Sequence, residues 1–587
     1  MKKQLIFIFS TLLMISIVSN NQKNNQEILN ETTTIKNNDT KIKLLQNNQE
    51  NTVDDYQCSK IFTQYGKDAD NEYLRFAIAI KGDVSSVKYT RVISSIDNQV
   101  EPIKMFSVNC LYNGIKNGDE ISYYSDNGEL VSEKTDYYWA CYTIKFTNTS
   151  EYKDKDISVF VSINDEEKSS ATKSLNEEKN NAQKYDVWDG ITENDFTKSE
   201  GQNADTYGTE NDPYLIKTSN DMAFFANEVK KGNGFDGKYI KLTKDLDMTN
   251  PKFTGIGDGD LVNGNWSTKE FKGNFDGDNH DVKLCVNKSY MAGLFNASSG
   301  TIKNVTTSGI VCTQNIVAGG IVGYLNGGTV ENVTNNAFVT GKFKETDILA
   351  GKGHIGGVIG LLQTGSVSNL TNNGFVYGYV TKKYAKQQGV GGVIGTIEKN
   401  ATAVNDLKNY GYVRNEGFCT GGAIGVIRKN DIEIKTLTNE GIISGKEGTG
   451  GVIGILNFSR VKIDGAINKG YVKGTCYVGG IMGGLGYTDN ISSTLSNAIN
   501  EGVVEATVEY SYGDGGYRCG GIVGMVRGKS KLDNSKLENC INKNNVKVEG
   551  IVTKENGDAN NKRVGYIVGY LLDTAIVSNC TNEYVNK

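Results

Sequence analysis

Two stretches of the sequence decide the fold: LTNEGIISGKEGTGGVIG at residues 437–454 and AINKGYVKGTCYVGGIMG at residues 466–483. Both follow one pattern, in which Asn-x-Gly leads to a β-branched residue and a glycine pair precedes two aliphatic residues and a third glycine. The alternation of residue types at period two within each half is typical of β-strands. An internal repeat of this kind predicts an array of equivalent structural units.

The pattern recurs along the C-terminal two thirds of the chain. Its glycine pairs begin at Gly319, Gly356, Gly391, Gly421, Gly450, Gly479 and Gly520, with degenerate copies at 292–295 and 565–569. The asparagine of the other half is Asn335, Asn372, Asn409, Asn439, Asn468, Asn500, Asn542 and Asn582. One residue type in one slot of successive copies predicts stacked coils about 4.8 Å apart, with these asparagines forming a structural ladder of hydrogen-bonded amides.

We therefore expect an all-β protein whose main domain is a parallel β-helix, or β-solenoid, with right-handed coils. Aliphatic columns that flank the ladder asparagines should fill its interior, and glycine should supply the turns with positive φ. The glycine pair with its following residues should form one strand. Copies differ in length at 342–353, 379–389, 507–517, 526–537 and 548–563, and these segments are expected to be surface loops.

The solenoid is expected to span 187–587, with an N-terminal cap and the first coils in 187–290. Ser219 is the expected N-cap of an amphipathic helix that carries Met222, Phe225 and Val229. This helix should close the open end of the solenoid.

Upstream, residues 53–165 alternate at period two and predict a small all-β domain that resembles a β-sandwich. The polar stretches 20–52 and 166–186 have the composition of linkers, the first of them Asn-rich and disordered. Residues 1–19 combine a basic start, an apolar run and Ser19, which is typical of a secretory signal peptide. The apolar run is shorter than the ~20 residues of a spanning helix, so no transmembrane segment is expected in the mature chain, which should be secreted or bound to the cell surface.

Composition narrows the classes of function. The 587 residues carry a net charge of −5, which argues against nucleic acid as a partner. His280 and His354 are the only histidines, and the ten cysteines contain no CxxC pair, so metal sites rich in these residues are not expected. We assign no catalytic residue, no cofactor and no metal ligand from the sequence.

Four patterns in the sequence contain residue types that could carry chemistry. Residues 276–281 (DGDNHD) have ligand types that suit a hard cation, but a tight turn explains the same composition. Asp245 and Asp247 alternate on one strand face and could act as the paired carboxylates of a glycoside hydrolase, but we prefer the interpretation that they form a polar strand end in the cap of the solenoid. Cys540 and Cys580 share one slot of adjacent coils, which allows either a disulfide or reduced apolar stacking.

The fourth pattern is an excess of tyrosine. An exposed aromatic face that stacks on sugars, or simple cross-strand pairs, would each account for it. The tyrosines concerned are Tyr324, Tyr377, Tyr379, Tyr384, Tyr410, Tyr412, Tyr471 and Tyr487.

From about residue 208 onward the chain resembles the GLUG-motif family of secreted and cell-surface proteins. The resemblance rests on Gly208-Thr209 with 212–215 (DPYL), on 242–247 (LTKDLD), on 271–277 (FKGNFDG) and on the repeats, although Ile or Val replaces the Leu of the motif in most copies. It implies a β-helical, adhesin-like protein. Some members of that family are parts of immunoglobulin-cleaving peptidases, but neither histidine here stands in HExxH, so the resemblance does not imply that activity.

We expect a non-enzymatic, adhesin-like protein that binds a glycan or an extracellular protein of a host or matrix through loops on a rigid solenoid. A polysaccharide lyase or glycoside hydrolase on a β-helix is the first alternative, by analogy of fold alone. A structural coat component is the second.

Overall fold

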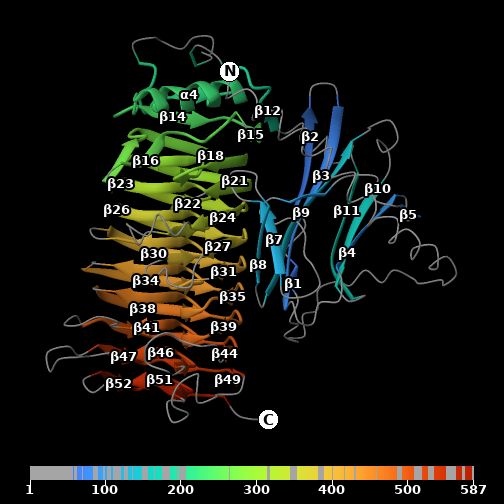
Figure 1. Cartoon of the computed structure of the whole chain (residues 1–587). Coiled ribbons are helices and arrows are strands. Elements are labelled where there is room, and N and C mark those ends of the chain that lie inside the picture. Colours follow the sequence, from blue (N-terminus) through green and yellow to red (C-terminus); the bar gives the residue numbers. More distant parts are fainter. Residues whose placement is uncertain are drawn as a thin grey trace. The chain divides into compact units, whose positions relative to one another are not determined.

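The structure is a computed structural model of the chain. It describes residues 185–584, and before them the backbone of strands β1 to β11 without their side chains. Within 185–584 the segments left out are 193–194, 197–205, 251, 263–264, 314–316, 344–352, 381–388, 399–400, 416, 429–430, 458, 486–491, 508–517, 527–534, 550–562 and 572–574. The chain divides into two compact units, Met1–Gln183 and Lys184–Lys587, each described by itself (Figure 1).

The first unit contains antiparallel sheets. A five-stranded sheet comprises β1 (Gln57–Cys58), β2 (Phe62–Asp68), β3 (Asn71–Asp83), β6 (Ser107–Asn109) and β9 (Tyr137–Thr147). A four-stranded sheet comprises β4 (Thr90–Ile96), β5 (Gln99–Glu101), β10 (Asp156–Ile163) and β11 (Glu166–Ser174). A two-stranded sheet comprises β7 (Glu120–Tyr124) and β8 (Leu130–Lys134).

Strand β11 lies in the segment 166–186 that we expected to be a linker. It is the edge strand of its sheet and pairs only with β10, so its polar sequence is compatible with a strand that needs one backbone partner. The predicted signal peptide 1–19 and the linker 20–52 lie outside the described residues, and the sandwich arrangement stays a prediction.

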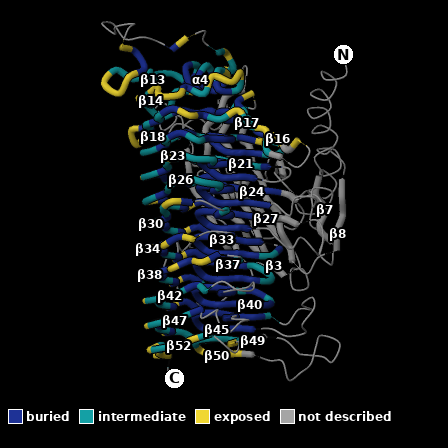
Figure 2. Tube along the Cα trace, turned by 90° about the vertical axis from the view of Figure 1, so that its left-hand side faces the viewer, coloured by how far each residue is buried: buried dark blue, intermediate teal, exposed yellow. Residues whose placement is uncertain are grey.

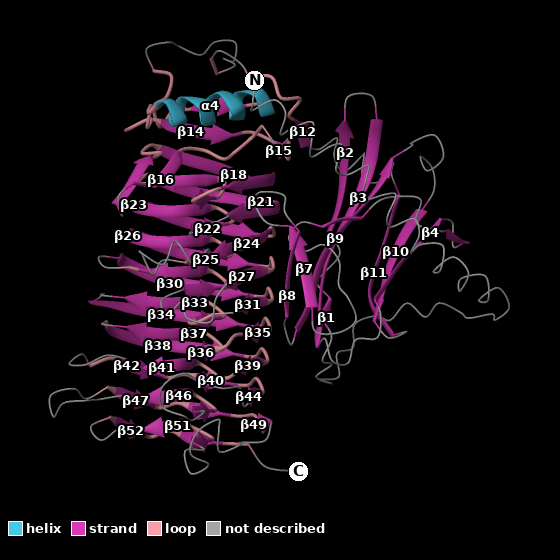
Figure 3. Ribbon diagram, viewed as in Figure 1, coloured by secondary structure: helices cyan, strands magenta, loops and turns pink. Residues whose placement is uncertain are grey.

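The second unit is a stack of coils whose strands form two long parallel sheets (Figure 3). The sheet of nine strands comprises β19 (Met291–Ala292), β22 (Val317–Gly319), β25 (His354–Gly356), β28 (Gly389–Gly391), β32 (Thr420–Gly421), β36 (Glu447–Gly450), β40 (Cys476–Gly479), β45 (Arg518–Gly520) and β50 (Arg563–Gly565).

The other sheet has 31 strands and forms the remaining faces of the coils. It starts with β12 (Tyr185–Val187), β13 (Tyr214–Ile216), β14 (Tyr239–Leu242) and β15 (Asp245–Met248). Strands that follow the glycine pairs are β20 (Phe295–Ser298), β29 (Ile394–Ile397), β33 (Ile424–Arg428), β37 (Ile453–Asn457), β41 (Met482–Leu485), β46 (Val523–Val526) and β51 (Val568–Leu571). Strands that end at or near the ladder asparagine are β23 (Val322–Asn335), β26 (Ile359–Asn372), β30 (Ala401–Asn409), β34 (Asp431–Asn439), β38 (Arg460–Asn468), β42 (Thr494–Ser496), β43 (Ile499–Asn500), β47 (Lys536–Glu538), β48 (Ile541–Asn542), β52 (Ile576–Ser578) and β53 (Thr581–Asn582).

After the ladder asparagine each coil continues in a further strand of this sheet, which forms the face before the nine-stranded sheet. These strands are β18 (Asn274–Lys288), β21 (Thr301–Thr313), β24 (Phe338–Phe343), β27 (Val376–Val380), β31 (Val413–Asn415), β35 (Ile443–Ser444), β39 (Val472–Gly474), β44 (Val504–Thr507) and β49 (Val546–Glu549). A hairpin of β16 (Asp258–Val262) and β17 (Asn265–Lys269) projects from the first coils. The pairing of each coil with the next confirms the expected parallel β-solenoid, and its right-handedness stays a prediction.

The glycine pairs lie at corners, which corrects the expectation of one continuous strand. Gly450 ends β36, and Gly451 and Val452 form the corner before β37 begins at Ile453. A Cβ atom on Gly451 would overlap the carbonyl oxygen of Gly480 in the next coil and the side chain of Asn468. Glycine is needed there because the next coil and the ladder leave no space for a methyl group.

Asparagine, rather than glycine, supplies most of the left-handed turns of the repeat. The residue three positions before each ladder asparagine has a φ between 52° and 77° and is Asn332, Asn369, Asp406, Thr436, Gly465, Asn497, Asn539 and Asn579. Asn and Asp adopt this conformation more readily than other residues that carry a Cβ, so the expectation that glycine would fill the turns was wrong for most coils.

One hydrophobic core runs through the coils. The β-branched residues four positions after the ladder asparagines, such as Val376, Val413, Ile443 and Val472, are fully buried and stack in register. Figure 2 shows this burial as an almost unbroken dark trace along the stack. Because each interior residue packs on its equivalent in the next coil, the repeat in the sequence becomes a continuous apolar column.

Helix α4 (Ser219–Lys231) lies across the first end of the stack (Figure 3). Met222, Phe225 and Val229 are fully buried on its inner face, as the amphipathic pattern predicts. The N-cap is Thr218 rather than Ser219, because Thr218 and Asp221 form a capping box: Asp221 N donates to Thr218 Oγ1 at 3.1 Å and Thr218 N to Asp221 Oδ2 at 2.9 Å. In the part of the chain that the structure describes, no helix is long and apolar enough to cross a membrane.

Candidate functional site

The ladder asparagines form a continuous chain of hydrogen bonds inside the solenoid. Each Nδ2 donates to the Oδ1 of the asparagine in the next coil over 2.8–2.9 Å, from Asn335 through to Asn582. Each Nδ2 also donates to the carbonyl oxygen two residues on, as Asn439 does to Gly441 at 2.9 Å. The amides are therefore satisfied by the protein itself, and the ladder is a structural element rather than a ligand array.

A stack of aromatic rings accompanies the ladder on one face, and sequence reasoning missed it. The rings of Phe338 and Phe375 are parallel with centroids 4.9 Å apart, and Tyr412 continues the stack at 5.1 Å. All three stand three residues after a ladder asparagine, so the repeat alignment contained the signal.

The described tyrosines do not form one exposed face. Tyr324 and Tyr377 are almost fully buried, and Tyr324 packs against Trp266. Tyr471 donates a hydrogen bond to Glu505, whereas Tyr410 is 47% exposed. Tyr384 and Tyr487 lie outside the described residues, as does the side chain of Tyr379. The sugar-stacking interpretation is therefore not supported by the tyrosines whose side chains are described.

A polar cluster on the outside of the first coils is the most chemically varied group of described side chains. His280 Nδ1 lies 2.9 Å from Asp245 Oδ1, which also accepts a hydrogen bond from the Asp281 backbone N at 3.0 Å. Asp281 Oδ2 accepts hydrogen bonds from Tyr185 Oη at 2.9 Å and Ser308 Oγ at 2.7 Å. Parallel pairing of β12, β15, β18 and β21 brings these residues from four coils to one place.

Burial dominates the electrostatics of this cluster. It raises the pKa of Asp281 against the opposing hydrogen bonds from Ser308 and Tyr185. It also raises the pKa of Tyr185, and the neighbouring Asp281 carboxylate adds to the effect. Asp281 Oδ1 is buried and has no hydrogen-bond partner among the described residues. A carboxyl group held in this way favours its protonated form and is chemically suited to donate a proton.

The other acidic candidates are separated by the fold. Asp247 is buried and accepts hydrogen bonds from Thr249 N and Oγ1, so it does not act with Asp245 as a pair. Asp276 contacts Asn304 and Lys303, whereas Asp278 pairs with Lys241 at 3.0 Å. The described residues contain no group of three or more His, Cys, Asp or Glu that could hold a metal ion.

His354 lies inside the solenoid, and Cys540 and Cys580 lie in its last two described coils. The His354 side chain is fully buried, and its Nδ1 lies 2.6 Å from Thr396 Oγ1. Cys540 N donates to Cys580 Sγ at 3.4 Å, and both side chains are thiols in this structure.

The connections between the coils vary in length along one edge of the solenoid. At this edge the chain passes from the strand that follows the ladder asparagine to a strand of the nine-stranded sheet. The connection has one to four residues in most coils: 289–290, 314–316, 416–419, 445–446 and 475. In the other coils the connection has 8 to 13 residues: 344–353, 381–388, 508–517 and 550–562. The strands on both sides keep their register across these insertions, so the insertions leave the scaffold unchanged.

No family model matches the chain, and no match was found among curated proteins or among solved structures.

Proposed function

We propose that this protein is a secreted or cell-surface adhesin-like protein of the GLUG-motif type, which binds a host or matrix ligand through the long connections on one edge of its solenoid. The observation that carries the proposal is that four of the six connections of eight or more residues between the described strands from β18 onward lie on that edge, while the coil beneath them is constant; the other two, 486–493 and 527–535, lie elsewhere. Rigid scaffolds commonly carry binding residues on such connections. The apolar run at 5–18 and the basic Lys2 and Lys3 support export.

The internal bonding of the solenoid supports a scaffold role. The asparagine ladder and the aliphatic columns bond coil to coil, so they hold the edge straight without a ligand. Connections that leave one edge of a rigid stack lie along one line, and their spacing is set by the coil repeat of about 4.8 Å. Such a line of connections suits an extended ligand.

The test is a binding screen with the full chain on glycans and extracellular-matrix proteins, in which retention and release of sugar products are measured together. The proposal expects saturable retention by at least one ligand class with no new reducing or unsaturated sugar ends. Absence of retention on every class would contradict it.

A carbohydrate-active enzyme is the second candidate, and the polar cluster at Asp281 favours it. A carboxyl group with a raised pKa beside the His280–Asp245 pair supplies the residue types for acid–base cleavage of a polysaccharide. Release of cleaved sugar that is lost in Asp281→Asn, with the fold retained, would favour the enzyme over the adhesin.

A further inference from the structure

The last coil of the solenoid has weaker packing than the coils before it. Val564, Tyr566, Leu571 and Val577 are between 36% and 47% exposed, although the equivalent positions in the preceding coil are buried. A coil with fewer buried apolar contacts opens more easily than the coils that pack tightly on both sides.

Two cysteines are stacked at this position. The column two residues before the ladder asparagine runs Leu437, Ala466, Ala498, Cys540 and Cys580. The cysteines occupy the last two slots and join the last coil to the one before it. The strand pairing of Ile541 with Thr581 begins at the next residue, so the two cysteines lie next to each other in adjacent coils.

The backbone around the two residues is in close register. Thr581 N donates to Cys540 O at 2.9 Å, and Cys540 N donates to Cys580 Sγ at 3.4 Å. Stacked residues of neighbouring parallel strands have Cα atoms about 4.8 Å apart, which lies within the range of about 4.4–6.8 Å seen in disulfides. As donors, both thiols make only weak hydrogen bonds, in which each Sγ lies 3.3–3.9 Å from backbone carbonyl oxygens.

We propose that Cys540 and Cys580 form a disulfide that fastens the last coil to the solenoid. The oxidant is a small-molecule disulfide such as oxidised glutathione. The Cys580 thiolate attacks one sulfur of this reagent, forms a mixed disulfide and releases one thiolate. Cys540 then loses its proton and attacks the Cys580 sulfur, so that the protein disulfide forms and a second thiolate leaves; the reagent gains the two electrons that the cysteines lose.

The order of attack follows from burial. Cys540 is fully buried, whereas Cys580 is partly exposed and is the sulfur that a reagent reaches first. Burial raises the pKa of the Cys540 thiol to about 12, so Cys540 reacts only once the mixed disulfide is beside it.

The first test uses the full chain purified without reductant and equilibrated with oxidised and reduced glutathione. Peptide mapping without reduction should recover one cross-linked species joining the peptides of Cys540 and Cys580. Recovery of both cysteines as separately alkylated thiols after denaturation would overturn the proposal.

The second test asks whether the bond fastens the coil. Amide hydrogen exchange of β52 and β53 should slow at least about tenfold on oxidation, while exchange of β34 stays unchanged. Cys580→Val, which places an aliphatic residue of this column at the site, should fold and lose the dependence on oxidant. In a relocated pair, Ala466→Cys and Ala498→Cys with Cys540→Ala and Cys580→Ala, oxidation should leave β52 and β53 unprotected. A cross-link that forms without slowing exchange in the last coil would also contradict the proposed role.

Discussion

The first and last coils of the solenoid end in different ways. At the first coils, α4 covers the interior, and its Phe225 ring contacts the rings of Phe235, Phe271, Phe275 and Phe295. In the last described coil, by contrast, residues such as Leu571 and Ile576 remain exposed. Since the stability of each coil depends on its packing, the difference teaches that in this chain unfolding should begin in the coil with the exposed apolar residues and that the end covered by α4 should resist it.

The largest effect is expected from removing the central ring of the cap. Phe225→Ala should lower the free energy of unfolding by about 3–5 kcal/mol, because a fully buried aromatic side chain is replaced by a cavity. Leu571→Ala in the exposed coil should cost less than about 1 kcal/mol. Urea unfolding of both full-length variants measures this contrast, and equal losses would contradict the comparison.

A single ladder position inside the stack should matter more than one at its end. Asn439→Ala should cost about 2–3 kcal/mol, because Asn409 Nδ2 and Asn468 Oδ1 each lose a buried partner. Asn582→Ala should cost about 1 kcal/mol or less, since Asn582 is exposed and is hydrogen-bonded to one ladder asparagine, Asn542. Thermal unfolding of the pair measures the difference; a larger loss for Asn582→Ala would overturn it.

The helix cap offers a smaller test at the same end. Thr218→Ala removes the acceptor of the Asp221 amide and should cost about 1 kcal/mol, whereas Thr218→Ser keeps the capping box and should cost much less. Hydrogen exchange of the first turn of α4 measures the loss. If the two substitutions cost the same, the capping box would not be what holds the start of the helix.

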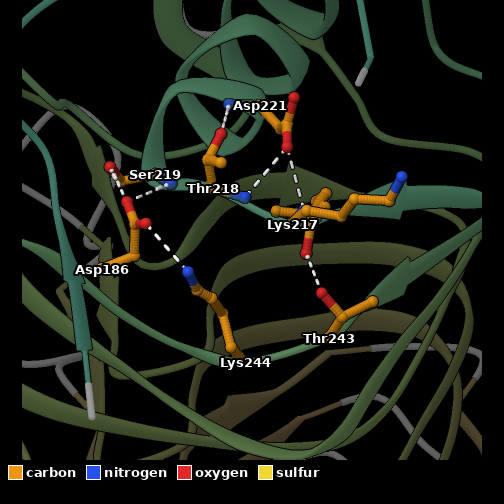
Figure 4. A network of polar contacts seen from close by, with 8 residues as sticks. Asp186, Lys217, Thr218, Ser219, Asp221, Thr243 and Lys244 are labelled. Carbon is orange, nitrogen blue, oxygen red and sulfur yellow. Dashed lines mark hydrogen bonds and ion pairs between the residues drawn. The ribbon is translucent and has the colours of Figure 1, made fainter. Parts of the chain in front are cut away.

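Two carboxyl groups near the cap should give the smallest effects, with opposite signs. Burial raises the pKa of Asp186, but hydrogen bonds from Ser219 and the Lys244 ammonium outweigh it and leave the pKa below the usual value (Figure 4). Its contribution to stability is therefore present above the unfolded pKa of 3.8 and is lost as the pH falls through the lower folded value. Asp186→Asn should destabilise the protein at pH 7 and reduce the loss of stability that occurs as the pH falls.

Asp281 should show the reverse behaviour. Because its folded pKa is raised, the folded state binds the proton more tightly, and stability falls as the pH rises from 3.8 through the folded value. Asp281→Asn should therefore be neutral or stabilising at pH 7. Unfolding midpoints of both variants, measured between pH 3 and pH 7, test the two predictions. Stability changes of the same sign in Asp186→Asn and Asp281→Asn at pH 7 would contradict them.

The repeat made the solenoid predictable, because identical residues in one slot of successive copies require stacked coils. The ladder positions and the helix with Phe225 follow from periodicity in the same way. The corner role of Gly451 could not be read from periodicity, because it depends on contacts with the next coil. The left-handed conformation of Asn332 was also missed, because a recurring position in a repeat does not give its φ. The cluster of Tyr185, Asp245 and Asp281 was also hidden, since it assembles residues almost 100 positions apart. Strand β11 was missed because an edge strand needs no apolar pattern.

The proposed function depends on the edge with the long connections, and one replacement tests it directly. In the coil of Ser444 the register-equivalent corner is Gly445-Lys446-Glu447, so residues 341–353 and 548–562 can each be replaced by Gly-Lys-Glu; this ends β24 at Thr340 and β49 at Lys547 and keeps the register of the rest of the coil. The matched control replaces 415–418, a corner that is already short, by the same three residues. The account predicts that the double replacement keeps the unfolding transition of the parent and loses at least about tenfold in affinity for the retained ligand, while the control binds as the parent does. Unchanged binding by a folded double replacement would contradict the account.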